Sequence, residues 1–163
     1  MRNLQEMGAR AAELLKARGE TVAVSESSAG GIVSAALLSI GGASTYYRGG
    51  AVVYTMQARA AYTEITLEEM RRQKIRSSSE PYAQLLAERN RVKLDATWGL
   101  AETGAAGPTG NRYGDAAGHT CLAVAGPVQL VRTLETASDD RLENMWVFAE
   151  AALALFVEAL EQA

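Results

Sequence analysis

Hydrophobic positions recur along the chain with two different periods. Apolar residues three or four positions apart predict helices over residues 3–18, 32–38 and 79–95, and a last helix beginning near Ser138–Asp140. Short apolar runs bounded by glycine or polar residues predict strands over 21–24, 51–55, 97–101, 119–125 and 129–136. Gly126-Pro127 lies between the last two strands and predicts a hairpin.

Strands that alternate with helices predict an α/β fold, and the closing hairpin requires antiparallel as well as parallel pairing. We therefore expect a three-layer α/β/α sandwich with a mixed β-sheet. The length of 163 residues fits one domain, which we expect to span 1–163.

Composition excludes several classes of protein. The net charge is −3 and no basic block occurs, which argues against a nucleic-acid binder. No apolar run reaches the roughly 20 residues of a membrane span, and no secretory signal pattern opens the chain, so we expect no membrane partner and a cytoplasmic location. His119 is the only histidine and Cys121 the only cysteine, so we predict no disulfide, metal site or cofactor.

Ser27 occupies the turn between the first predicted strand and the next helix, with Gly30 and Gly31 directly behind it. Glycines permit a sharp turn there, and free N–H groups at a helix start can face negative charge. This arrangement suits a serine nucleophile with its own oxyanion donors. Equally, Ser25, Ser27 or Ser28 could simply cap the helix.

A second segment, Glu102–Gly118, follows a predicted strand and is rich in glycine. It matches neither the dinucleotide fingerprint nor the phosphate loop that ends in Gly-Lys-Ser/Thr. Long glycine-rich loops in compact domains are usually functional, so the segment predicts a loop that binds a small ligand or an anion.

Four short motifs follow one another in the order Glu26–Gly31 (ESSAGG), Tyr54–Arg59 (YTMQAR), Thr103–Pro108 (TGAAGP) and Asp139–Arg141 (DDR). They resemble the ESCTGG, YSNEAK, (S/T)GIAGP and GDR motifs of the CinA C-terminal domain family, which includes stand-alone nicotinamide mononucleotide deamidases. The resemblance spans nearly the whole chain.

The resemblance implies hydrolysis of the amide of nicotinamide mononucleotide to give nicotinate mononucleotide and ammonia. It implies that Ser27 is the nucleophile and that Thr103 helps to hold the oxyanion. The remaining implied contacts to this small phosphorylated nucleotide come from Gly30, Gly31, Gly104, Gly107 and Arg141. We also expect a homo-oligomer.

Arg59 stands where the family has a lysine. A lysine can lose its proton and act as a base, whereas an arginine stays charged. Tyr54 could compensate, because a nearby guanidinium would stabilise its phenolate. Glu102, expected at the lip of the glycine loop, could instead have become the base with Arg59 holding it or the phosphate, or the two could form a structural ion pair.

Arg141 opens the last predicted helix, where a phosphate would meet both a guanidinium and free N–H groups. The alternative is a surface salt bridge with Asp139 or Asp140. His119 and Cys121 are expected to have structural roles. Besides the amidohydrolase, two hypotheses stay open: a nucleotide-binding module that has lost turnover, and an amidase or deaminase with another substrate.

Overall fold

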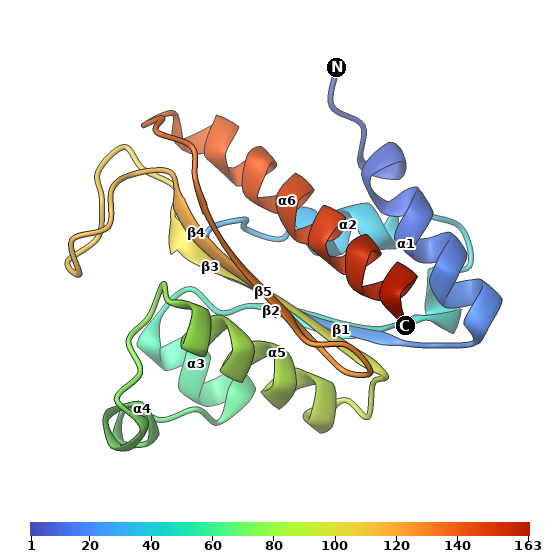
Figure 1. Cartoon of the computed structure of the whole chain (residues 1–163), viewed down its shortest axis with the longest axis horizontal. Coiled ribbons are helices and arrows are strands. Elements are labelled where there is room, and N and C mark those ends of the chain that lie inside the picture. Colours follow the sequence, from blue (N-terminus) through green and yellow to red (C-terminus); the bar gives the residue numbers. More distant parts are fainter.

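A computed structural model describes all 163 residues as a five-stranded sheet between two layers of helices (Figure 1). The helices are α1 (Leu4–Arg18), α2 (Ile32–Leu38), α3 (Met56–Thr63), α4 (Leu67–Gln73), α5 (Glu80–Lys93) and α6 (Arg141–Gln162). The strands are β1 (Val22–Glu26), β2 (Tyr47–Val52), β3 (Trp98–Ala105), β4 (His119–Ala125) and β5 (Leu130–Glu135).

The strands are ordered β2-β1-β3-β4-β5 across the sheet. β1 runs parallel to β2 and to β3, whereas β3, β4 and β5 are successively antiparallel. The predicted α/β sandwich, mixed sheet and hairpin are confirmed. Because β1, β2 and β3 run in the same direction, their carboxyl ends meet at one edge of the sheet. The segments 27–31, 53–55 and 106–118 all leave the sheet at this edge.

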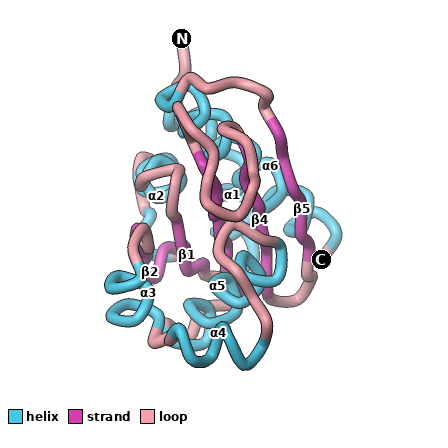
Figure 2. The backbone as a smooth tube through the Cα atoms, turned by 90° about the vertical axis from the view of Figure 1, so that its left-hand side faces the viewer, coloured by secondary structure: helices cyan, strands magenta, loops and turns pink.

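Each face of the sheet carries its own hydrophobic core. Both views place α1, α2 and α6 together over one face and α3, α4 and α5 together over the other (Figure 1 and Figure 2). In the first core, the rings of Trp98 and Phe156 meet edge to face, with centroids 5.9 Å apart. The Trp98 indole N–H donates to Glu20 at 2.7 Å, so the buried ring keeps a polar partner. The second core includes Leu86 and Ile65 from the α3–α5 side.

The structure shifts β2 from the predicted 51–55 to Tyr47–Val52. Gly49 and Gly50, which precede the predicted strand, pair with Ala23 and Val24 of β1. A Cβ on Gly50 would lie 2.5 Å from the Tyr47 hydroxyl, so glycine permits this close packing. Residues 53–55, predicted as strand, therefore lie beyond the sheet.

Two short helices, α3 and α4, fill a region for which the sequence pattern predicts no element. Thr55 caps α3 and Thr66 caps α4, each through a hydroxyl that accepts a backbone N–H. β3 also continues four residues past its predicted end at Ala101. This extension takes Glu102, Thr103 and Gly104 out of the predicted loop and into the sheet.

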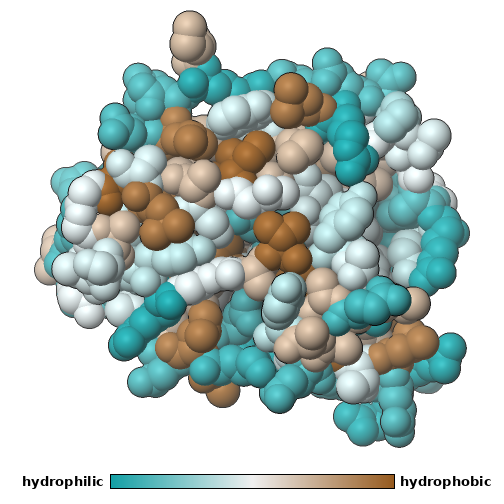
Figure 3. Space-filling view, turned by 180° about the vertical axis from the view of Figure 1, so that it is seen from behind, coloured by the Kyte–Doolittle hydropathy of each residue, from teal (hydrophilic) through white to brown (hydrophobic).

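Large hydrophobic side chains on the surface include Leu38, Tyr54, Tyr62, Val92 and Leu142. Seen from behind, the molecule shows hydrophobic residues in separate groups among hydrophilic ones (Figure 3). The homo-oligomer stays a prediction. None of the helices combines the length and apolar character that a membrane span requires.

Candidate functional site

Glu26 closes the start of α2, directly behind the Ser27 turn. Its carboxylate is buried and accepts the N–H groups of Gly31 (3.0 Å), Val33 (2.9 Å) and Ser34 (2.9 Å). Gly31 is the N-cap, with φ of 101°, and no side chain of its own is available to cap. The expected serine cap is therefore wrong: the carboxylate at the end of β1 satisfies the orphan N–H groups instead.

Glu102 lies beneath the same turn and is only 1 % exposed. Its Oε2 accepts the N–H groups of Ser27 (3.0 Å) and Ala29 (2.8 Å), and its Oε1 accepts the hydroxyls of Ser28 and Thr120. Burial raises the pKa of Glu102, and these four hydrogen bonds offset that rise only in part. The expectation that Glu102 stands at the lip of the glycine loop is wrong, because β3 continues past it and turns its side chain inward.

These two carboxylates use most of the backbone donors of the turn. The expectation of several free N–H groups facing a ligand is therefore wrong. The Ser28 N–H alone, among the amides of residues 27–34, makes no hydrogen bond within the chain. The Ser27 hydroxyl likewise has no partner, and Ser27 lines a cavity. The backbone of the turn is thus fixed by hydrogen bonds, whereas the Ser27 hydroxyl oxygen has no hydrogen-bond partner.

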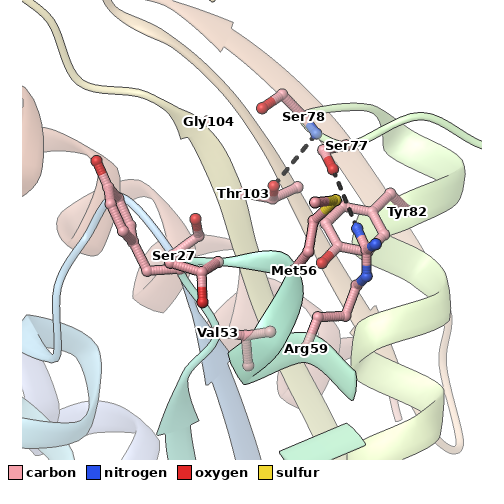
Figure 4. Close-up of a pocket in the computed structure, with 11 residues that line it drawn as sticks. Ser27, Val53, Met56, Arg59, Ser77, Ser78, Tyr82, Thr103 and Gly104 are labelled. Atoms are coloured by element: carbon pink, nitrogen blue, oxygen red, sulfur yellow. Dashed lines mark hydrogen bonds between the residues drawn. The ribbon is translucent and has the colours of Figure 1, made fainter. Parts of the chain in front are cut away.

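That cavity, here called the Ser27 pocket, has a volume of about 290 Å³ (Figure 4). It lies at the carboxyl ends of the parallel strands and draws its walls from the β1–α2 turn, α3, α5, β3 and the segment before α5. It is lined by Ser27, Val53, Tyr54, Thr55, Met56, Arg59, Ser77, Ser78, Tyr82, Thr103 and Gly104. Four predicted catalytic residues meet there: Ser27, Tyr54, Arg59 and Thr103.

Arg59 comes from α3 and lies on the opposite side of the pocket from Ser27, next to Tyr82 (Figure 4). The residue is 4 % exposed, and its Nη1 donates a long 3.4 Å hydrogen bond to the Ser77 hydroxyl. Its guanidinium carbon is 5.8 Å from the centre of the Tyr82 ring, and its Nε has no partner. Arg59 forms no ion pair, so both versions of the expected contact with Glu102 are wrong: that carboxylate is fully engaged beneath the turn.

Thr103 and Gly104 form the floor of the Ser27 pocket. The Ser78 N–H donates to the Thr103 hydroxyl at 3.3 Å, which leaves the hydroxyl proton free to be donated. A Cβ on Gly104 would lie 2.3 Å from the His119 carbonyl oxygen, so only glycine allows β3 and β4 to approach this closely. Ser77, Ser78 and Tyr82 were missed as pocket residues because they lie far from every recognised motif.

Arg141 is the first residue of α6 and lines a second cavity of about 240 Å³, here called the Arg141 pocket. Its guanidinium donates to the Gly107 carbonyl and, at 3.0 Å, to the Tyr54 hydroxyl. The expected salt bridge with Asp139 or Asp140 is absent, since Asp140 instead caps α6. The pocket is lined by Ser28, Tyr54, Gly104, Ala105, Ala106, Gly107, Thr109, Gly110, Asn111 and Arg141.

The two cavities adjoin, because Tyr54 and Gly104 line both of them. The candidate site is thus a pair of adjoining pockets. Gly30 and Gly31 line neither one. Their conformations shape the turn that carries Ser27, with φ values of 67° and 101°.

His119 and Cys121 have the structural positions expected of them. The His119 ring is buried, with Nδ1 bonded to Glu135 and Nε2 bonded to the Ser78 carbonyl at 2.8 Å. Cys121 is buried in the second core, and burial raises the pKa of its thiol. No group of three or more His, Cys, Asp or Glu side chains is arranged to hold a metal ion.

Together these observations define an α/β/α fold with two adjoining pockets beside the carboxyl ends of its parallel strands. The model of the CinA C-terminal domain matches residues 4–160. The chain therefore belongs to the CinA C-terminal domain family.

Sequence relatives support this family assignment. The CinA-like protein of Prochlorococcus marinus (strain MIT 9313) is 37 % identical over 115 residues, which are 71 % of this chain and 26 % of the relative. That of Trichodesmium erythraeum (strain IMS101) is 30 % identical over 145 residues, 89 % of this chain and 34 % of the relative. The chain thus spans about a quarter to a third of these relatives.

Solved structures share the whole fold. The competence damage-inducible protein A (ComA) of Klebsiella pneumoniae subsp. pneumoniae MGH 78578 aligns with a TM-score of 0.88 and 26 % identity, over 98 % of each chain. The competence or damage-inducible protein of Enterobacter asburiae aligns with a TM-score of 0.87 and 26 % identity, over 98 % of this chain and 99 % of that one.

Proposed function

We propose that this protein hydrolyses the carboxamide of a phosphorylated pyridine nucleotide, nicotinamide mononucleotide or a close analogue, with Ser27 as nucleophile. The observation that carries the proposal is the Ser27 residue itself. Its backbone N–H is held by Glu102, while its hydroxyl lacks a partner and its side chain lines the cavity. A nucleophile needs this combination of a fixed backbone and an uncommitted oxygen.

In this reaction, Ser27 Oγ adds to the amide carbon and the amide oxygen becomes negative. We assign the stabilisation of that oxygen to the Thr103 hydroxyl and the Ser28 N–H, two donors that have no acceptor within the chain. The C–N bond then breaks, and the nitrogen leaves as ammonia after gaining a proton. Water hydrolyses the remaining ester, which releases the carboxylate product and restores Ser27.

Tyr54 is the group best suited to carry the Ser27 proton to the leaving nitrogen. It lines both pockets, and its oxygen accepts a hydrogen bond from Arg141, which orients the hydroxyl. Arg59 cannot be the base, because a guanidinium remains protonated. Glu102 acts as a positioning residue, since its oxygens are all used beneath the turn.

The Arg141 pocket is the proposed site for the substrate phosphate. It combines a guanidinium with the amino-terminal end of α6, a helix of 22 residues whose first N–H groups favour an anion. Gly107 and Gly110 line this pocket where a Cβ would lie 2.8 Å from the Asp139 carbonyl oxygen and 2.1 Å from the Asp115 carbonyl oxygen, so glycine allows the loop to fold this closely.

One alternative has a specific observation in its favour. Arg59 replaces the lysine expected of the family, and nothing else in the Ser27 pocket is a strong base at neutral pH. The protein would then bind the nucleotide without turnover. Both functions require the same pocket and differ in whether ammonia is released.

The experiment is to incubate the purified protein with nicotinamide mononucleotide and measure ammonia. We expect release in the wild type, and none from Ser27→Ala, whose unfolding free energy should change by less than about 1 kcal/mol. Ser44→Ala, at an exposed serine outside both pockets, is the matched control. Full activity in Ser27→Ala would contradict the nucleophile, and tight binding without ammonia in the wild type would establish the alternative.

A further inference from the structure

A third cavity lies on the other side of Arg59 and is lined by four arginines. Its volume is about 260 Å³, and it receives Arg59 from α3, Arg71 from α4, and Arg76 and Arg112 from loops. None of its lining residues is acidic. We call it the arginine pocket.

Only one of these four charges is neutralised within the chain. Asp115 accepts both terminal nitrogens of Arg76, at 2.7 Å and 3.2 Å. Arg59, Arg71 and Arg112 form no ion pair. Arg59 is the most informative of the three, because it is 4 % exposed and its Nε has no partner. A buried charge without a counter-ion is costly, so this arrangement favours an anion from outside the chain.

Tyr113 reports the local positive charge. Arg76 and Arg112 both lie against its ring, with guanidinium carbons 5.2 Å and 5.1 Å from the ring centre. Burial would raise the pKa of Tyr113, but a hydrogen bond from Arg112 and the charges of Arg112 and Arg59 lower it overall. Arg112 also donates a hydrogen bond to the Tyr113 hydroxyl at 3.1 Å.

We propose that the arginine pocket binds a phosphate-type anion, best a diphosphate group. Guanidinium groups bind phosphate oxygens in bidentate fashion, and three unpaired ones match a group that carries several negative charges. This pocket shares Met56, Arg59 and Ser77 with the Ser27 pocket. A ligand bound there lies beside the Ser27 pocket, whereas Arg141 lines the other adjoining pocket. Anion binding at the arginine pocket does not depend on amidase activity.

Calorimetric titration with inorganic pyrophosphate at low ionic strength tests this site. We expect saturable binding to the wild type that weakens as salt is added. The double variant Arg71→Gln/Arg112→Gln should bind at least about tenfold more weakly, because two charge-assisted contacts are lost. Both residues are exposed, so the variant should fold normally. Arg72→Gln, the next residue on the same helix and outside the pocket, is the matched control and should bind as the wild type does.

Two further variants separate this site from the proposed active site. Ser27→Ala and Arg141→Gln should both retain pyrophosphate binding, whatever their effect on ammonia release. Three results would overturn the proposal: no binding to the wild type, equal binding by the double variant and the wild type, or binding lost in Arg141→Gln but kept in the double variant.

Discussion

The two sides of the Ser27 pocket differ in how their buried charges are balanced. On the side of the β1–α2 turn, Glu26 accepts three hydrogen bonds and Glu102 accepts four, all from groups of the chain itself. On the side of α3, Arg59 is almost as deeply buried, yet the only hydrogen bond of its side chain is a long one to Ser77.

This difference separates the side of the pocket that stabilises the fold from the side that is suited to bind a ligand. A buried carboxylate with all its lone pairs used stabilises the turn around it and has nothing left to offer a substrate. A buried guanidinium without a carboxylate keeps an unpaired charge, and binding of an anion or a polar ligand would pair it. Substitutions on the carboxylate side should therefore change stability, and those on the arginine side should change binding and rate.

The largest effect is expected from Arg59→Lys. A lysine at this buried position has no carboxylate to keep it charged, so it can lose its proton and accept the Ser27 proton. General-base catalysis is worth about 10²–10⁴-fold, so kcat for ammonia release should rise by up to that factor. The control is Arg71→Lys, which lies in the arginine pocket but not in the Ser27 pocket. Equal kcat values for Arg59→Lys and the wild type would show that residue 59 is not placed to act on Ser27.

Glu102→Ala should have the largest effect on stability. The N–H groups of Ser27 and Ala29 and two hydroxyls would lose their acceptor in a buried place, at a cost of about 3–5 kcal/mol in unfolding free energy. Glu88→Ala removes an acid from a surface pair with Arg91 and should cost less than about 1 kcal/mol. Urea denaturation measures both. A loss in Glu102→Ala no larger than in Glu88→Ala would mean that the carboxylate does not hold the turn.

The sequence predicted the layers and the Ser27 turn because both depend on local pattern. Apolar periodicity marks α1, α5 and α6, and the Gly126-Pro127 turn marks the hairpin of β4 and β5. The motif resemblance brought Ser27, Tyr54, Arg59 and Thr103 to one site. All four line one cavity, and their roles in catalysis stay predictions.

What could not be predicted depends on pairing between distant segments. Whether Glu102 faces a ligand or the turn is decided by how far β3 continues, and the register with β4 sets that length. The arginine pocket joins residues from four separate segments, namely α3, α4, the segment between α4 and α5, and the loop after β3. None of these carries a recognisable motif beyond residue 59. α3 and α4 are short, and their few apolar positions show no clear helical stripe.

The smallest effect is expected from the pH dependence of His119, which sits behind the pocket rather than in it. Burial lowers the pKa of His119, but its hydrogen bonds to Glu135 and to the Ser78 carbonyl, with the charge of Asp115, raise it overall. A histidine whose pKa is higher in the folded state stabilises the fold fully below the unfolded value of about 6.5. That contribution is lost as the pH rises through the folded value.

Wild-type unfolding free energy should therefore fall by about 1–2 kcal/mol, the scale of a charge-assisted hydrogen bond, as His119 becomes neutral. His119→Gln keeps a donor for the Ser78 carbonyl but does not titrate, so its stability should be lower at acid pH and flatter across the same range. Urea denaturation of both proteins through neutral pH measures the difference. A wild-type stability that rises with pH relative to His119→Gln would mean that the folded protein prefers neutral His119. In that case the neutral ring would be held by its hydrogen bonds alone, with no contribution from a positive charge.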